Sequence, residues 1–160
     1  MLIPGVLLGI VLIFLFNRPL FEAVYRGAGI VIIAWTLRYL ALSWNGIGAS
    51  LKSIDSDLTD AARLEGASGW SLLRYVLWPQ IAGQVGALSY LTYLLCLWDV
   101  ETLILIYPPG GETLALRIFN LLHYGHNAQV SALCLLLLVL AVAPLVGWSI
   151  WRGLRKRLVT

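Results

Sequence analysis

Four apolar segments, and the scarcity of charge around them, constrain the fold of this chain most. The segments cover residues 2–16, 27–44, 81–98 and 128–151. A helix needs about 17–25 largely apolar residues to cross a bilayer, so the last three segments are long enough and the first is short. Charged residues make up 12% of the 160, about half of their share in soluble domains. The sequence therefore predicts an all-α, polytopic membrane protein with about four transmembrane helices in a single domain over residues 1–160.

The basic residues indicate how these segments cross the membrane. Arg152, Arg155, Lys156 and Arg157 follow the last apolar segment directly. A cluster beside a span indicates the cytoplasmic side, and this one is too short to suggest a nucleic-acid-binding tail. With four spans, residues 45–80 are also cytoplasmic, and the cytoplasmic segments then carry seven Lys and Arg residues against three outside. We expect a multi-pass protein with both termini in the cytoplasm, partnered by the lipid bilayer and by no nucleic acid.

Arg38 is the one charged residue inside an apolar segment. It precedes Trp44, the end of its segment, by six residues, or about 9 Å along a helix. A long basic side chain at so shallow a depth can reach the membrane interface. We therefore interpret Arg38 as an interfacial residue in preference to one that lines a translocation path.

Residues 45–80 contain no apolar run long enough to span a membrane. The pattern predicts a helix over residues 58–65, with a left-handed residue at Gly66 ending it. A second helix is expected from Ser68 or Gly69 through Trp78, and Pro79 should break or kink the chain there. Candidate residues to cap the first helix are Ser53, Asp55, Ser56, Asp57 and Thr59.

This loop resembles the EAA loop of permease subunits of ATP-binding-cassette (ABC) importers. In that family Glu-Ala-Ala, three residues, Gly, nine residues and Ile-x-Leu-Pro follow one another. Ala61, Ala62, Gly66 and Pro79 fall at the family spacing, with Asp60 in place of Glu. The resemblance implies that the loop docks on a cytoplasmic ABC ATPase subunit and transmits its closure to the membrane helices. The predicted coupling residues are Asp60, Ala61, Ala62, Glu65, Gly66 and Pro79.

The resemblance extends along nearly the whole chain and is closest to the iron(III)-type branch of these permeases. It is carried by residues 4–10, 17–19, 107–114 and 117–125. It implies a subunit of the bacterial inner membrane that moves a small solute inward by alternating access, with iron(III) or another inorganic ion as the expected solute. Family permeases usually have six spans, so this chain looks like the last four, or like the C-terminal end of a fused double-length permease. A second permease subunit or domain is then an expected partner.

Residues 99–127 lie outside in the predicted topology. Pro108, Pro109, Gly110 and Gly111 form a turn signal. They precede an expected short helix over 113–122, in which Leu114, Ile118, Leu121 and Leu122 form an apolar stripe. In the resembled family such outer loops meet an extracytoplasmic solute-binding protein, and we expect that contact at residues 108–111.

Two alternative functions differ in kind from a transporter subunit. The first is a membrane enzyme with an outer metal site at Asp99, His123 and His126, although no third ligand stands at a characteristic spacing beside the two histidines. The second is a truncated or structural membrane module without transport activity. The sequence offers no catalytic set and no phosphate-binding loop, so ATP hydrolysis is expected on a separate subunit. No cofactor or metal is predicted, and Cys96 and Cys134 are expected to be apolar packing residues.

Overall fold

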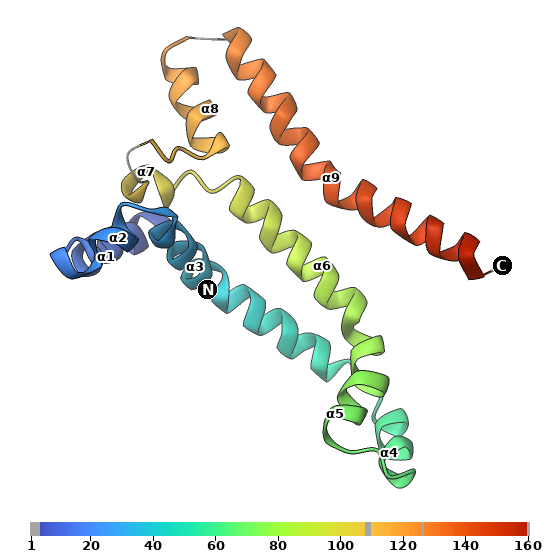
Figure 1. Cartoon of the computed structure of the whole chain (residues 1–160). Helices are drawn as coiled ribbons and strands as arrows, with labels where there is room; N and C mark the ends of the chain where they lie inside the picture. Colours follow the sequence, from blue (N-terminus) through green and yellow to red (C-terminus); the bar gives the residue numbers. More distant parts are fainter. Residues whose placement is uncertain (1–3, 108–109, 126, 160) are drawn as a thin grey trace. The chain divides into compact units, whose positions relative to one another are not determined.

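The computed structural model describes residues 4–107, 110–125 and 127–159, with side chains up to residue 152 (Figure 1). Within these ranges every regular element is helical, which confirms the all-α prediction. The elements are α1 (Gly5–Phe16), η1 (Pro19–Phe21), α2 (Glu22–Tyr25), α3 (Ala28–Lys52), α4 (Ser56–Leu64), α5 (Gly69–Leu72), η2 (Leu73–Leu77), α6 (Trp78–Leu97), α7 (Leu103–Ile106), α8 (Leu114–His123) and α9 (Asn127–Val159).

Among the described residues, three helical runs are long and apolar enough to cross a membrane. They are Ala28–Lys52, Gly69–Leu97 and Asn127–Arg152. The first apolar segment behaves differently, because α1 ends at Phe16 and the chain bends by 104° into Pro19–Tyr25. The count rises to four only when this bent pair is taken as one span, which agrees with the prediction of about four spans and of a short first segment.

Helix α3 continues well past the apolar segment that predicted it. The apolar run ends at Trp44, but the helix extends to Lys52, about 12 Å further. Arg38 therefore lies near the middle of α3 and not near its end, and its placement at the membrane interface stays a prediction. The guanidinium carbon of Arg38 lies 5.9 Å from the ring centre of Tyr39.

The chain divides into two compact units, and each is described by itself. One unit contains residues 37–93, and the other contains the described parts of 3–36 and 94–160. In the second unit an apolar core joins α1, α3 and α7. The core residues are Leu8, Leu12, Ile30, Val31, Ala34, Leu103 and Ile106.

Helix α1 approaches α7 closely through glycine. Gly5, Leu8, Gly9 and Leu12 form the buried face of α1. A Cβ atom on Gly9 would lie 3.1 Å from Cδ1 of Leu105, tighter than an ordinary van der Waals contact, so glycine eases the close approach of the two helices. The backbone N–H of Gly5, in the first turn of α1, donates to Oε1 of Glu101 at 3.1 Å. A negatively charged carboxylate near the N-terminus of a helix also interacts favourably with the helix dipole.

In the same unit, α8 packs against the start of α9. The helix confirms the prediction for residues 113–122, and Thr113 caps it by accepting from the N–H of Leu116. Its buried face is formed by Ala115, Leu116 and Ile118. The predicted stripe is therefore only partly the packed face, and Leu122 at its end is exposed.

The first unit is a helical hairpin made by the second half of α3, the loop helices and the first part of α6. Gly46 of α3 faces Leu88 of α6 so closely that a Cβ on Gly46 would lie 2.8 Å from Leu88 Cδ1 and 3.2 Å from its Cγ. Gly48, on another face of α3, has no such neighbour within 4 Å. The glycine at 46 is thus the position that lets these two helices pack closely.

Candidate functional site

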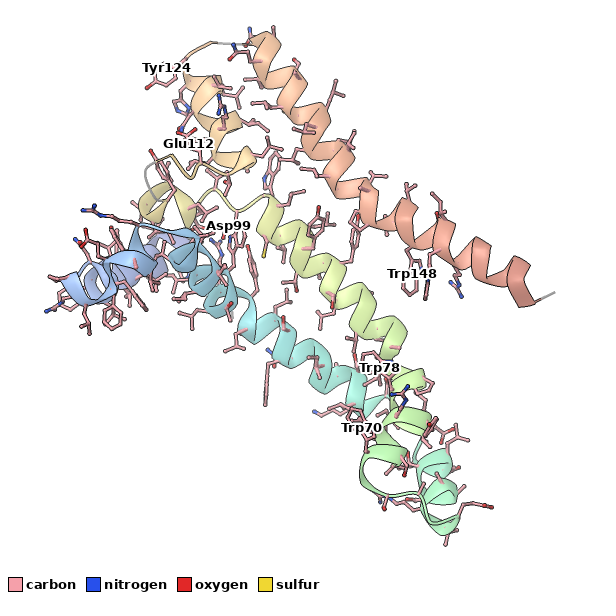
Figure 2. The ribbon with its side chains drawn as sticks, viewed as in Figure 1. Trp70, Trp78, Asp99, Glu112, Tyr124 and Trp148 are labelled. Carbon is pink, nitrogen blue, oxygen red and sulfur yellow. The ribbon has the colours of Figure 1, made fainter. Side chains whose placement is uncertain are left out.

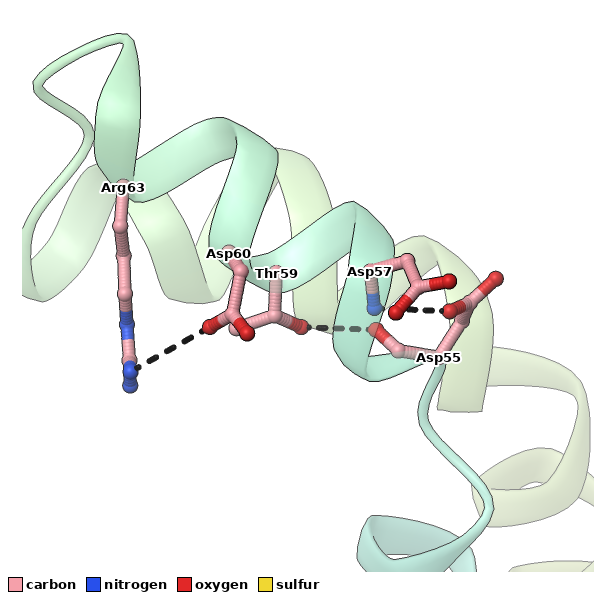
Figure 3. A network of polar contacts seen from close by, with 5 residues as sticks. All are labelled: Asp55, Asp57, Thr59, Asp60 and Arg63. Carbon is pink, nitrogen blue, oxygen red and sulfur yellow. Dashed lines mark hydrogen bonds and ion pairs between the residues drawn. The ribbon is translucent and has the colours of Figure 1, made fainter.

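Helix α4, in the loop of residues 45–80, begins at Ser56, earlier than the predicted start. Asp55 is its N-cap, and its Oδ1 accepts the backbone N–H of Asp57 at 2.9 Å (Figure 3). The hydroxyl of Thr59 donates to the carbonyl oxygen of Asp55 at 3.0 Å. Of the several candidate caps in the sequence, Asp55 is therefore the one that satisfies the free N–H groups of the first turn.

The C-terminal end of α4 confirms the left-handed residue predicted at Gly66. Its φ angle is +87°. The N–H of Ala67 donates to the carbonyl of Ala62 at 2.9 Å, and the N–H of Gly66 donates to that of Arg63 at 3.0 Å. These two bonds form a Schellman motif, in which glycine avoids the cost of a left-handed conformation. Both ends of this short helix are therefore fixed by residues of the loop itself.

The predicted coupling residues on α4 are open to a partner. Asp60, Ala61, Glu65 and Gly66 are exposed, and Ala62 is half-buried. Asp60 forms an ion pair with Arg63 at 3.9 Å (Figure 3), and both side chains are largely exposed. Such a long, exposed pair contributes little to stability, so the Asp60 carboxylate can leave Arg63 for another cation at small cost.

Of the break or kink predicted at Pro79, the break is not found. The helical run is continuous from Gly69 to Leu97, and residues Leu73–Leu77 form a π-helical turn in which the N–H of Trp78 donates to the carbonyl of Leu73. In an α-helix the ring of Pro79 would clash with the carbonyl of Tyr75, four residues earlier. The wider π turn encloses Tyr75, and this accommodates the proline without ending the helix.

Two glutamines on α6 form hydrogen bonds to the segment that connects α3 with α4. Gln80 accepts the backbone N–H of Asp55 at 3.0 Å with Oε1 and donates to the carbonyl of Val76 at 3.0 Å with Nε2. One helical turn later, the Gln84 amide lies 3.1 Å from the Ser53 hydroxyl. The sequence reading missed both residues, because their partners lie 25 and 31 positions away; only their four-residue spacing hinted at a shared face.

Aromatic residues surround the π turn. Trp70 and Trp78, both labelled in Figure 2, line an open hollow with Leu73, Arg74 and Tyr75. The side chains of Trp70, Tyr75 and Trp78 are 71%, 74% and 50% exposed. Tryptophan, tyrosine and arginine gather where helices meet the headgroup region of a membrane, so this composition fits a helix that enters a bilayer near residue 78.

The predicted outer-loop site is described only in part. Pro108 and Pro109 lie outside the described residues. Gly110 has a φ of +77°, which fits the predicted turn, and Gly111 is exposed. Beyond the turn, Oε1 of Glu112 accepts from the side-chain amide of Asn120 at 3.4 Å.

The residues of the alternative metal site have local partners. Oδ1 of Asp99 accepts the N–H of Thr102 at 3.1 Å, and the Nδ1 atom of His123 lies 3.1 Å from the carbonyl oxygen of Phe119. His126 lies outside the described residues. Across the described part of the chain, no three His, Cys, Asp or Glu side chains are grouped to hold a metal ion.

Comparison with known proteins places this chain beside bacterial permeases. It is 29% identical over 113 residues to the permease protein PhnV of Salmonella paratyphi A, named for a 2-aminoethylphosphonate transport system; the match covers 71% of the chain and 43% of PhnV. It is 31% identical over 97 residues to the spermidine/putrescine transport system permease protein PotC of Escherichia coli K12, covering 61% of the chain and 37% of PotC. No family model matches the sequence. The chain thus spans less than half the length of these curated relatives, and it is homologous to permease proteins of bacterial transport systems.

Proposed function

We propose that this chain is a permease subunit of an ABC importer and that α4 is its coupling helix. The observation that carries the proposal is the construction of the loop. Helix α4 is capped at both ends by its own residues, exposes Asp60, Ala61 and Gly66, and leads into the helical run Gly69–Leu97, which is long enough to span a membrane. A partner that moves α4 would therefore move a span, and the homology to transport permeases supports this use.

The proposal includes the partners and the orientation. A cytoplasmic ATPase subunit would bind α4 and hydrolyse ATP, and a second permease subunit or domain would complete the pathway. The basic residues near the C-terminus favour an inner-membrane protein with both termini in the cytoplasm. In that orientation residues 108–111 face outward and would contact an extracytoplasmic solute-binding protein.

The proposal also concerns the identity of the transported solute. The sequence resemblance points to iron(III) or another inorganic ion, whereas the relatives are named for 2-aminoethylphosphonate and for spermidine and putrescine. We propose a small solute that is handed over by a binding protein. Uptake of labelled iron(III), 2-aminoethylphosphonate and spermidine, each measured with its binding protein, would separate these solutes.

The decisive experiment is co-purification of the ATPase subunit from membranes with wild type and with Gly66→Arg. We expect wild type to retain the ATPase and Gly66→Arg to lose it while staying in the membrane, because an arginine side chain would fill the docking surface. Gly125→Arg is a matched control: Gly125 also has a positive φ, +74°, with no atom within 4 Å of an added Cβ. Equal retention by the two variants, or no capture by wild type, would overturn the proposal.

A second experiment addresses the outer loop. Replacing residues 108–111 with a neutral linker of equal length should abolish solute transfer from the binding protein. The ATPase should still co-purify, because the change lies outside the loop of α4. Unchanged transfer would show that the binding protein docks elsewhere.

A further inference from the structure

We infer that Gln80 is a positioning residue that locks the start of α4 to the π turn of the membrane-entering helix. The inference rests on the proposed function, because it specifies how motion of α4 would reach the span. It concerns one side chain, outside the residues of the EAA pattern, that joins two backbone segments of the hairpin. The contacts that carry it all lie within residues 37–93, one compact unit.

The side-chain amide of Gln80 forms one hydrogen bond through its oxygen and one through its nitrogen. Its oxygen accepts the N–H of Asp55, the residue that caps α4, and its nitrogen donates to the carbonyl of Val76 inside the π turn, each at 3.0 Å. The two partners fix the amide orientation, because a backbone N–H requires the oxygen and a backbone carbonyl requires the nitrogen. A hydrocarbon side chain offers neither group, and a carboxylate offers only the acceptor.

The position of Gln80 makes this bridge mechanically direct. It follows Pro79 and lies three residues after the π turn of Leu73–Leu77, and π turns are frequent at functional sites. Asp55 in turn holds the first turn of α4 through its bond to Asp57. A displacement of α4 therefore pulls on the peptide of Asp55, then on Gln80, and then on Val76.

The neighbouring hydrogen bond of Gln84 should contribute less to the position of α4 than those of Gln80. The Ser53 hydroxyl accepts from Nε2 of Gln84 and donates its own hydrogen to the carbonyl of Ser50 at 2.8 Å, within its own segment. Ser53 thus keeps a local partner when Gln84 is removed, whereas, among the described side chains, Gln80 alone binds the N–H of Asp55. Loss of Gln80 should therefore loosen α4 more than loss of Gln84.

A distance measurement tests the lock without requiring transport. Spin labels would be attached through Leu58→Cys in α4 and Leu91→Cys in α6, both exposed positions, with Cys96→Ala and Cys134→Ala removing the native thiols. In lipid nanodiscs we expect one narrow distance distribution for the parent and a clearly broader one for Gln80→Met. Gln80→Glu, which keeps the acceptor, should fall between them.

The matched control is Gln129→Met, which changes an exposed glutamine of α9 in the same way. It should leave the distribution narrow, and Gln84→Met should broaden it less than Gln80→Met. A distribution for Gln80→Met as narrow as that of the parent would overturn the inference. This result would stand whether or not an ATPase subunit is captured.

The assembled transporter provides the second readout. Gln80→Met should still co-purify with the ATPase, because α4 remains exposed, but the solute uptake per ATP hydrolysed should fall about two- to tenfold, the factor expected for losing the one bond that reaches α4, from Asp55. A loss of ATPase capture with unchanged uptake per ATP would assign Gln80 a merely structural role. If no variant and no wild type captured an ATPase, the proposed function would fail, and the distance distributions alone would decide the lock.

Discussion

The two compact units of this protein are stabilised internally by different interactions. In the unit that joins α1, α7 and the first part of α3, the core is apolar, and Leu12, Ile30 and Leu103 are almost completely buried. In the hairpin of residues 37–93, the loop helices are exposed, and their ends are fixed by hydrogen bonds from Asp55 and Gln80. The first arrangement resists deformation through packing, and the second holds a short helix in place while leaving its surface free.

This difference indicates a division of labour. A docking helix must present its surface to a partner, so it cannot be stabilised by burying that surface. Caps and side-chain-to-backbone bonds achieve order without burial. A packed apolar core, by contrast, is rigid, and its buried side chains are not available to a partner. Each of the following predictions tests one side of this contrast.

The largest effect is expected from Leu103→Ala in the apolar core. Leu103 has no exposed surface, and truncating a buried leucine costs about 2–5 kcal/mol through lost contacts and a cavity. The melting temperature of the purified protein in nanodiscs should fall clearly. Leu135→Ala, at a position that is 64% exposed in α9, is the control and should change it little; equal shifts would contradict the assigned core.

A somewhat smaller effect is expected from Gly46→Leu in the hairpin. The added side chain would collide with Leu88, and overpacking typically costs about 1–3 kcal/mol. Gly48→Leu lies on the same helix with no atom within 4 Å of an added Cβ, and it should be tolerated. Combining Gly46→Leu with Leu88→Ala should recover part of the lost melting temperature; no recovery would argue that the helices meet elsewhere.

Asp55→Ala should loosen α4 without disturbing the core. Removing an N-cap of this kind costs about 0.5–2 kcal/mol of helix stability. Hydrogen exchange should accelerate at the amides of residues 57–60, while the core amides of α3 keep their protection. Asp57→Ala removes the same charge but no cap bond, so a comparable acceleration in that variant would refute the role of Asp55.

The smallest effect on stability is expected from Asp60→Asn. Its ion pair with Arg63 is long and exposed, and such pairs contribute at most about 1 kcal/mol. The melting temperature should therefore stay within error of wild type, while the amount of co-purified ATPase should fall if Asp60 meets a cation of that subunit. A lowered melting temperature with full ATPase capture would reverse this assignment.

The sequence predicted those features that depend on neighbouring residues. Apolar length predicted the three long spans, and the local pattern around Gly66 predicted a helix closed by a left-handed glycine. The helix of residues 113–122 followed from its periodicity. Each of these rests on interactions within a few positions of the chain.

The remaining features do not follow from apolar length or from the local sequence pattern alone. Helix α3 continues to Lys52 although its apolar run ends at Trp44, because helix formation does not require continuous apolarity. The continuous helix across Pro79 depends on a π turn, and the partners of Gln80 become visible only once the hairpin has formed. The close approach of α1 to α7 was signalled by the four-residue spacing of Gly5 and Gly9, which the sequence reading did not use.

Site-specific cross-linking tests the docking of α4 most directly. Ala61→Cys would be introduced into a chain carrying Cys96→Ala and Cys134→Ala, and membranes containing the ATPase subunit would be treated with a short thiol-to-amine cross-linker. Leu122→Cys, at an exposed position of α8, would serve as the control. The account predicts an adduct of the chain with the ATPase from Ala61→Cys and none from Leu122→Cys. No adduct from Ala61→Cys, or equal adducts from both positions, would contradict the assignment of α4 as the coupling helix.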